Sequence, residues 1–290
     1  MKTAARLAAV LALGVGASGC IAVDMLVKVK GDGSGTVEKS ITMNPQALQE
    51  MKSEMEAAGF KDTKEGKKAE PEKSPMEMTD KELLDGPFDP EALKKEAAAM
   101  GPGVTFVSAT PIRQPDKMGV KAVFAFKDIN TLKLNQKPAG PAAGEGKSSP
   151  EDELKFALAK APSGNALLKL RSSGFAKGKS SPKPKETPPP GMEKMADGMM
   201  QMMKTMLKGL RITIGVEVDG QVVKTNSPYA SGSRVTYMDL EFDKLLADEK
   251  ALKAFDDMEG SLEEQKAALS KVKGMKVHLE PEMVVEFKAN

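Results

Sequence analysis

Alternating apolar and polar residues predict β-strands along much of the chain. Residues 23–30 and 36–43 alternate with period two and are joined by the glycine-rich residues 31–35, so they predict a β-hairpin. Asp219-Gly220 predicts the turn of a second hairpin, and a change of parity near Tyr237 predicts a β-bulge. The same alternation predicts further strands at 104–112, 119–127, 212–218 and 283–287.

Helix-start signals lie between these strands. Asn44-Pro45 and Asp89-Pro90 each place a capping side chain before a proline, which predicts two helices. Ser261-Leu262-Glu263-Glu264 is a capping box and predicts a third. A further helix, rich in Met, is expected over 192–207.

The expected fold class is α+β, with a mainly antiparallel sheet and helices packed on one of its faces. Half-buried strands leave one apolar face that another layer must cover. We expect a single domain over 20–290, since the apolar segments suffice for one substantial core. Flexible polar inserts are expected where the chain lacks apolar residues able to pack, at 61–75, 137–150 and 176–190.

The N-terminus has the pattern of an export signal. Lys2 and Arg6 precede the apolar run from Leu7 to Val15, which is too short to span a bilayer as a helix. Small residues follow and end at Cys20. The pattern predicts a signal peptide over 1–19, with the cleavage signal formed by Ala17, Ser18 and Gly19.

Ala17-Ser18-Gly19-Cys20 resembles the lipobox of bacterial lipoproteins. The resemblance implies that the Cys20 thiol carries a diacylglyceryl group, that cleavage occurs before Cys20, and that the new amine is often acylated. It implies a membrane partner reached through acyl chains. Ile21 stands where many inner-membrane lipoproteins have Asp, which favours the outer membrane and its periplasmic face.

The first predicted strand begins almost directly after Cys20. Three spacer residues before Val23 reach only about 10 Å in extended form. We therefore expect the folded body to rest against the leaflet without a long tether.

Composition excludes several classes of site. The chain has one Cys and one His, which excludes an internal disulfide, Cys-based zinc sites and multi-histidine metal centres. Without Lys2 and Arg6 the number of basic residues equals the 41 acidic ones, so no charge excess favours nucleic acid.

The sequence also offers little for catalysis. His278 is interpreted as a surface or edge-strand imidazole, because no Ser-containing nucleophile elbow accompanies it. No phosphate-binding glycine loop opens a helix. We expect a protein that is not an enzyme and needs no cofactor.

The Met-rich helix allows three interpretations. Most of its Met side chains fall within about one third of the helix circumference, which is typical of a stripe packed on a sheet. The same stripe is also compatible with the wall of a groove for acyl chains or a partner helix, and with a Cu(I) site. The candidate groove or soft-metal face comprises Met195, Met199, Met202, Met203 and Met206.

Residues from Leu210 to Phe242 resemble the membrane-distal domain of LppM-like bacterial lipoproteins. The similarity is carried by Val218, Gly220, Val222-Val223, Thr225-Asn226 and Ser231-Gly232-Ser233-Arg234-Val235-Thr236-Tyr237. The resemblance implies a sheet-and-helix fold akin to lipid-binding folds, contact with lipids or glycolipids, and no catalytic residue. The leading hypothesis is a lipid-contacting module, and the alternative is a structural or protein-interaction lipoprotein without a ligand.

Overall fold

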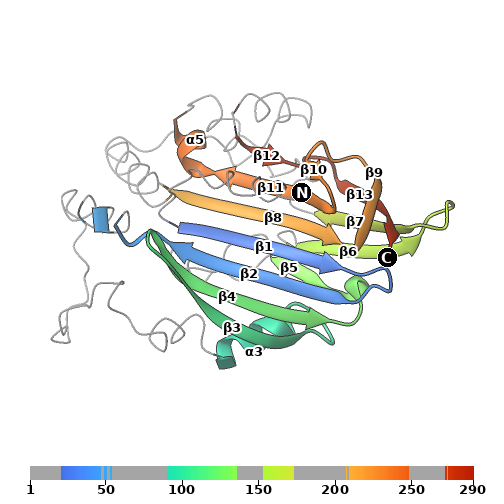
Figure 1. The fold of residues 1–290 in the computed structure, drawn as a ribbon, viewed down its shortest axis with the longest axis horizontal. Helices are drawn as coiled ribbons and strands as arrows, with labels where there is room; N and C mark the ends of the chain where they lie inside the picture. Colours follow the sequence, from blue (N-terminus) through green and yellow to red (C-terminus); the bar gives the residue numbers. More distant parts are fainter. Residues whose placement is uncertain are drawn as a thin grey trace, which may run out of the picture.

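The computed structural model describes two β-sheets that face each other across one core (Figure 1). We call the eight-stranded one sheet A and the five-stranded one sheet B. The described residues are 21–46, 49–50, 53, 90–135, 153–172, 207, 209–247, 272 and 274–290.

Sheet A has the strand order β10-β11-β8-β1-β2-β4-β3, and β12 pairs with β11. β1 runs parallel to β8 and antiparallel to β2, which places it inside the sheet. The strands are β1 (Ile21–Val29), β2 (Gly35–Met43), β3 (Thr105–Gln114), β4 (Lys117–Phe126), β8 (Leu210–Val218), β10 (Ala230–Ser231), β11 (Arg234–Glu241) and β12 (Lys276–Val277).

Sheet B has the order β5-β6-β7-β13-β9 and is antiparallel throughout. Its strands are β5 (Lys133–Asn135), β6 (Glu153–Lys160), β7 (Ala166–Ser172), β9 (Gly220–Thr225) and β13 (Glu282–Ala289). Among the described residues, the sheets are accompanied by the short helical elements α3 (Pro90–Ala99), the 3-10 helix η2 (Ile129–Thr131) and α5 (Phe242–Leu246).

The core fills the space between the two sheets. Period-two alternation sends every second side chain of a strand inward, so one apolar row from each strand becomes buried. Both sheets contribute to a single cluster, whose largest fully buried members include Tyr237, Phe124, Phe287, Ile214, Leu154, Leu168 and Leu170.

Helix α3 contributes to the same core and carries an ion pair into it. Leu93 and Ala97 are buried on the face of α3 that meets the cluster. Lys39 has the inward parity of Val37 on β2 and is only 5% exposed. Its Nζ lies 2.5 Å from a Glu96 carboxylate oxygen on α3. The helix is thus linked to the sheet by a largely buried charge pair as well as by apolar contacts.

Several sequence predictions are confirmed. Residues 23–30 and 36–43 form the expected antiparallel hairpin, and the β11 register shifts between Thr236 and Met238, where the bulge was predicted. Asn44 caps the next helical residues, because its Oδ1 accepts the Gln46 N–H at 3.0 Å. The helix predicted after Asp89-Pro90 is α3.

The predicted α+β class is wrong, because the described part of the chain is mostly strand and a second sheet covers sheet A. Residues 154–159 and 166–171, which are apolar at alternate positions, belong to β6 and β7 of that second sheet. Half-buried alternation looks the same whether a helix or another sheet covers the face, so the pattern did not distinguish them. The helix predicted from the capping box at 261–264 and, except for residue 207, the helix over 192–207 lie outside the described residues, as do all three inserts.

The predicted hairpin at Asp219-Gly220 is also wrong. β8 already pairs with β1 on one side and with β11 on the other, so it has no free edge for β9. The chain instead crosses at Gly220 into sheet B, where β9 pairs with β13.

Gly220, at this crossing, is expected to tolerate a side chain poorly. Its φ is +151°, and a Cβ placed there would lie 2.1 Å from the Lys288 carbonyl oxygen. We expect Gly220→Ala to lower the free energy of unfolding by about 2–3 kcal/mol in denaturant titrations. Gly232→Ala is the matched control, because Gly232 also has positive φ but its Cβ would meet nothing within 4 Å. Equal losses for the two variants would contradict the close approach.

Candidate functional site

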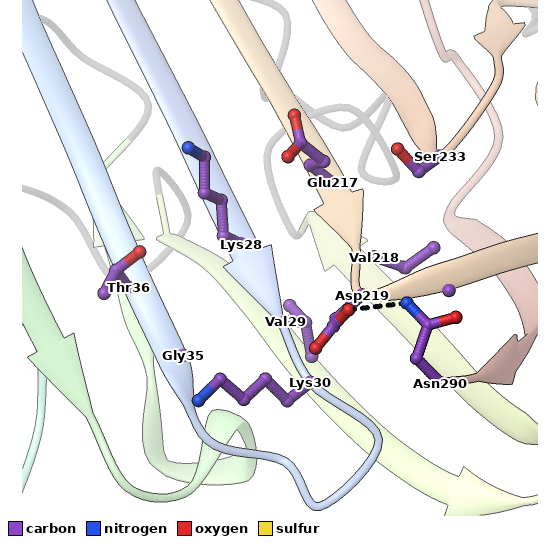
Figure 2. Close-up of a pocket in the computed structure, with 11 residues that line it drawn as sticks. Lys28, Val29, Lys30, Gly35, Thr36, Glu217, Val218, Asp219, Ser233 and Asn290 are labelled. Atoms are coloured by element: carbon purple, nitrogen blue, oxygen red, sulfur yellow. Dashed lines mark hydrogen bonds between the residues drawn. The ribbon is translucent and has the colours of Figure 1, made fainter.

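A polar groove of about 430 Å³ opens where β1 and β8 end (Figure 2). Because these strands run parallel, Val29 and Val218 finish side by side and bring distant segments together. The start of β2 and the chain crossing at Asp219-Gly220 form further sides of the groove. The lining residues are Lys28, Val29, Lys30, Gly35, Thr36, Glu217, Val218, Asp219, Gly220, Ser233 and Asn290.

Local turn chemistry fixes the shape of this groove. The β1–β2 turn is closed by the Lys30 N–H bonded to the Ser34 carbonyl at 2.9 Å. The Asp219 N–H donates to the Val29 carbonyl at 2.8 Å, which ties the crossing to the end of β1. The Asp219 carboxylate accepts the Asn290 side-chain amide at 2.9 Å (Figure 2).

Charges of both signs meet in the groove and on the sheet beside it. Lys28 lies directly opposite Glu217 on β8, and its ammonium bonds Glu38 at 2.8 Å. That hydrogen bond raises the pKa of Lys28. Burial opposes ionisation of Glu38, but hydrogen bonds from Lys121 and Lys28 outweigh it and lower the pKa of the Glu38 carboxyl. These opposite charges therefore largely neutralise one another at neutral pH.

The groove can hydrogen-bond a polar group but has no nucleophile–imidazole pair. Its lining contains neither Cys nor His. Within the described ranges, no three His, Cys, Asp or Glu side chains are placed to hold a metal ion. The groove therefore offers carboxylate, ammonium and hydroxyl groups for binding.

The residues predicted to carry the lipid anchor adjoin the described fold. Cys20 and the cleavage residues Ala17, Ser18 and Gly19 lie outside the described residues. The next residue, Ile21, already belongs to β1, and its N–H donates to the Gly209 carbonyl at 3.1 Å. The strand predicted near the anchor thus begins two residues earlier than the sequence indicated.

The predicted Met face cannot be placed on the fold. Met195, Met199, Met202, Met203 and Met206 lie outside the described residues, so the three interpretations of this segment stay predictions.

Of the two interpretations of His278, the surface imidazole is wrong, whereas the edge-strand position fits, because His278 directly follows β12 and its N–H donates to the Tyr237 carbonyl of β11 at 2.8 Å. His278 is 3% exposed, and its Nε2 lies 3.3 Å from the Glu282 carbonyl oxygen. Its ring centroid lies 6.2 Å from that of Tyr237, whose hydroxyl is buried without a regular hydrogen bond. Burial raises the pKa of Tyr237, and the nearby Ser172 hydroxyl partly offsets this. His278 and Leu279, between β12 and β13, are both buried. A strand of only two residues is too short for its alternation to predict this burial from the sequence.

Sequence reasoning missed the groove residues and the Lys39–Glu96 pair. Lys39 could have been noticed, because it interrupts the inward-facing row of Val37 and Ile41. Glu217 and Asp219 gave no such signal, since their importance depends on the parallel pairing of β1 with β8.

Comparison with known proteins gives one distant structural likeness. No known family model and no curated protein matches the sequence. The fold is similar to the NMR structure of the folded domain of LppM from Mycobacterium tuberculosis, over 96% of this chain and 95% of that chain. The identity is 11% and the TM-score 0.31. This likeness is distant, and it shows neither a lipobox nor a ligand.

Within the described ranges, no helix combines the length and the apolarity needed to cross a bilayer.

Proposed function

We propose that the protein is a lipid-anchored component of the bacterial cell envelope and acts there as a non-catalytic, lipid-contacting module. In this proposal the Cys20 thiol carries the acyl chains, and the body faces the periplasm from the outer membrane. More than one acyl chain is needed for durable anchoring, since a single chain holds a protein only reversibly.

The observation that supports this proposal most is the start of the fold directly after the lipobox. Ile21 is hydrogen-bonded into sheet A, and its strand lies between β2 and β8. A residue fixed in this way cannot act as a flexible tether. An acyl group on Cys20 would therefore hold the sandwich within a few ångströms of the leaflet.

A structural or protein-interaction role without a ligand is the second candidate. It is favoured by the packing of the described core, where apolar side chains from both sheets fill the interior. The groove at the ends of β1 and β8 is lined in part by charged side chains, including Lys28, Glu217 and Asp219, which an acyl chain would desolvate.

Native mass spectrometry of the mature chain with Cys20→Ser separates the two candidates. The protein has to begin at residue 20, because a shorter version would remove part of β1. We expect phospholipid to co-purify with the protein and to dissociate at higher collision energy. A ligand-free mass in repeated preparations would support the structural role and contradict lipid handling.

A further inference from the structure

The outer face of sheet B is basic. Its outward positions alternate with the buried rows of β6, β7 and β13. The basic side chains on this face are Lys133, Lys155, Lys169, Arg171, Lys224 and Lys288. They outnumber the acidic side chains, which are Glu153, Glu282 and Glu286.

Like charges stand directly opposite one another on this face. Lys133 pairs in register with Lys155, and Lys155 pairs with Arg171. Such neighbours destabilise a sheet unless an anion lies between them. The side chain of Lys155 is 51% exposed, that of Arg171 is 68% exposed, and an anion in solvent can reach both.

Among the residues that the structure describes, the carboxylates nearby neutralise only part of this charge. Glu282 bonds both Arg171 and Lys169, the latter at 3.0 Å, and hydrogen bonds from these two side chains lower the pKa of its carboxyl. Lys155 lies 3.8 Å from Glu153, at the limit of an ion pair. The cross-strand row of Lys133, Lys155, Arg171 and Glu282, which we call the basic row, therefore keeps a positive surplus at neutral pH.

The outer face of sheet A shows that this surplus is not general. There Glu38 lies between Lys28 and Lys121, at 2.8 and 2.7 Å. Arg211 and Asp239 form a two-point ion pair at 2.9 and 3.1 Å. Charges of opposite sign are paired on sheet A, whereas like charges are neighbours on sheet B.

The basic row lies one layer away from β1, in sheet B. The C-terminal part of β6 lies at the β1–β2 turn, since Leu158 is 3.5 Å from the position of a Cβ on Gly33. Figure 1 shows β6 running toward the same side as β1. Lys155 precedes Leu158 by about 10 Å of strand and therefore lies nearer to the turn than Ile21 does, since β1 extends about 26 Å from Ile21 to Val29.

We propose that the outer face of sheet B rests on anionic phospholipid headgroups of the bilayer that holds Cys20. The inference rests on the proposed function, because the anchor supplies the bilayer. Each Lys or Arg at an anionic surface strengthens binding about fivefold, and a basic patch combined with an acyl chain fixes a protein more firmly than either alone. The anchor sets the distance to the membrane, and the basic face sets the orientation.

A fluorescent label on the acylated mature protein tests this orientation. Once Cys20 is acylated, a new cysteine is the only free thiol of the chain. Ala157→Cys places the label on the exposed outer face of sheet B, and Thr110→Cys places it on that of sheet A. The protein is reconstituted into vesicles of phosphatidylcholine alone or with phosphatidylglycerol, and a water-soluble quencher measures access to the label.

We expect phosphatidylglycerol to reduce quenching of the Ala157→Cys label severalfold, to leave the Thr110→Cys label unchanged, and to lose its effect at high salt. Lys133→Gln with Lys155→Gln is expected to restore quenching and to raise stability slightly, because it removes a like-charge pair. Lys95→Gln with Lys127→Gln removes the same charge from exposed positions away from this face and is expected to change neither.

Protection that is equal in neutral vesicles, protection of Thr110→Cys instead, or persistence in the Lys133→Gln, Lys155→Gln variant would overturn the inference. Full quenching of both labels in all vesicles would also overturn it. The mass of residue 20 in the same preparation reports acylation separately. The proposed anchor and the proposed orientation can therefore fail independently.

Discussion

Replacing Cys20 by Ser is expected to move the protein from the membrane fraction to the aqueous fraction. Each buried CH₂ contributes about 0.8 kcal/mol, so losing two or three acyl chains removes most of the membrane affinity. No described helix could replace the anchor by spanning the bilayer. Fractionation in high salt, followed by detection of the protein in both fractions, measures the effect.

Ser18→Ala is the matched control for this change. It keeps a small residue in the predicted cleavage signal and leaves the thiol in place, so the protein is expected to stay with the membrane. A Cys20→Ser protein that remained fully membrane-bound in high salt would show that something other than acyl chains on residue 20 holds it there.

Glu96→Gln is expected to lower the free energy of unfolding by about 2–4 kcal/mol, because it leaves the buried Lys39 ammonium without its counter-charge. The Glu96 side chain is 30% exposed, so water offsets part of the loss. Denaturant titration of the mature Cys20→Ser chain measures the change. Adding Lys39→Met to Glu96→Gln removes the isolated charge and is expected to recover much of the stability.

Glu91→Gln is the control for this prediction. Glu91 lies on the same helix and pairs with Lys94 at 2.8 Å, but both side chains are well exposed. Such surface pairs contribute little, and a change below about 1 kcal/mol is expected. If Glu96→Gln destabilised the protein no more than Glu91→Gln, the buried pair would not hold α3 in place.

Local signals predicted the local parts of this fold. The first hairpin depends on alternation and on a glycine-rich turn, and both are contained in 23 consecutive residues from Ile21 to Met43. The bulge near Tyr237 and the start of α3 are equally local, since one follows from side-chain parity and the other from a capping residue before Pro90. These features could be predicted because neighbours in sequence determine them.

The rest depends on pairings between distant segments. The residues of β8 do not show that β1 pairs with one of its edges and β11 with the other. Because both edges of β8 are paired, β9 cannot pair with β8 and instead joins sheet B. The covering of sheet A by a second sheet has the same origin. Alternation identifies an apolar face but does not say which layer packs against it.

The candidate sites divide in the same way. Cys20 could be proposed as the acylated residue because its surroundings form a contiguous motif, and this stays a prediction. The polar groove could not, since Lys28 and Glu217 become neighbours only through parallel strands nearly two hundred residues apart in sequence. The basic row of sheet B likewise exists only once Lys133, Lys155 and Arg171 are brought into register.

Mass spectrometry of the N-terminal peptide from membrane-purified protein reports the chemical state of residue 20 itself. The proposed anchor predicts a peptide that begins at Cys20, is heavier by a diacylglyceryl group and, where the amine is modified, by one further acyl chain, and runs on into the residues of β1. A mature N-terminus at another residue, or a free thiol at position 20, would contradict it.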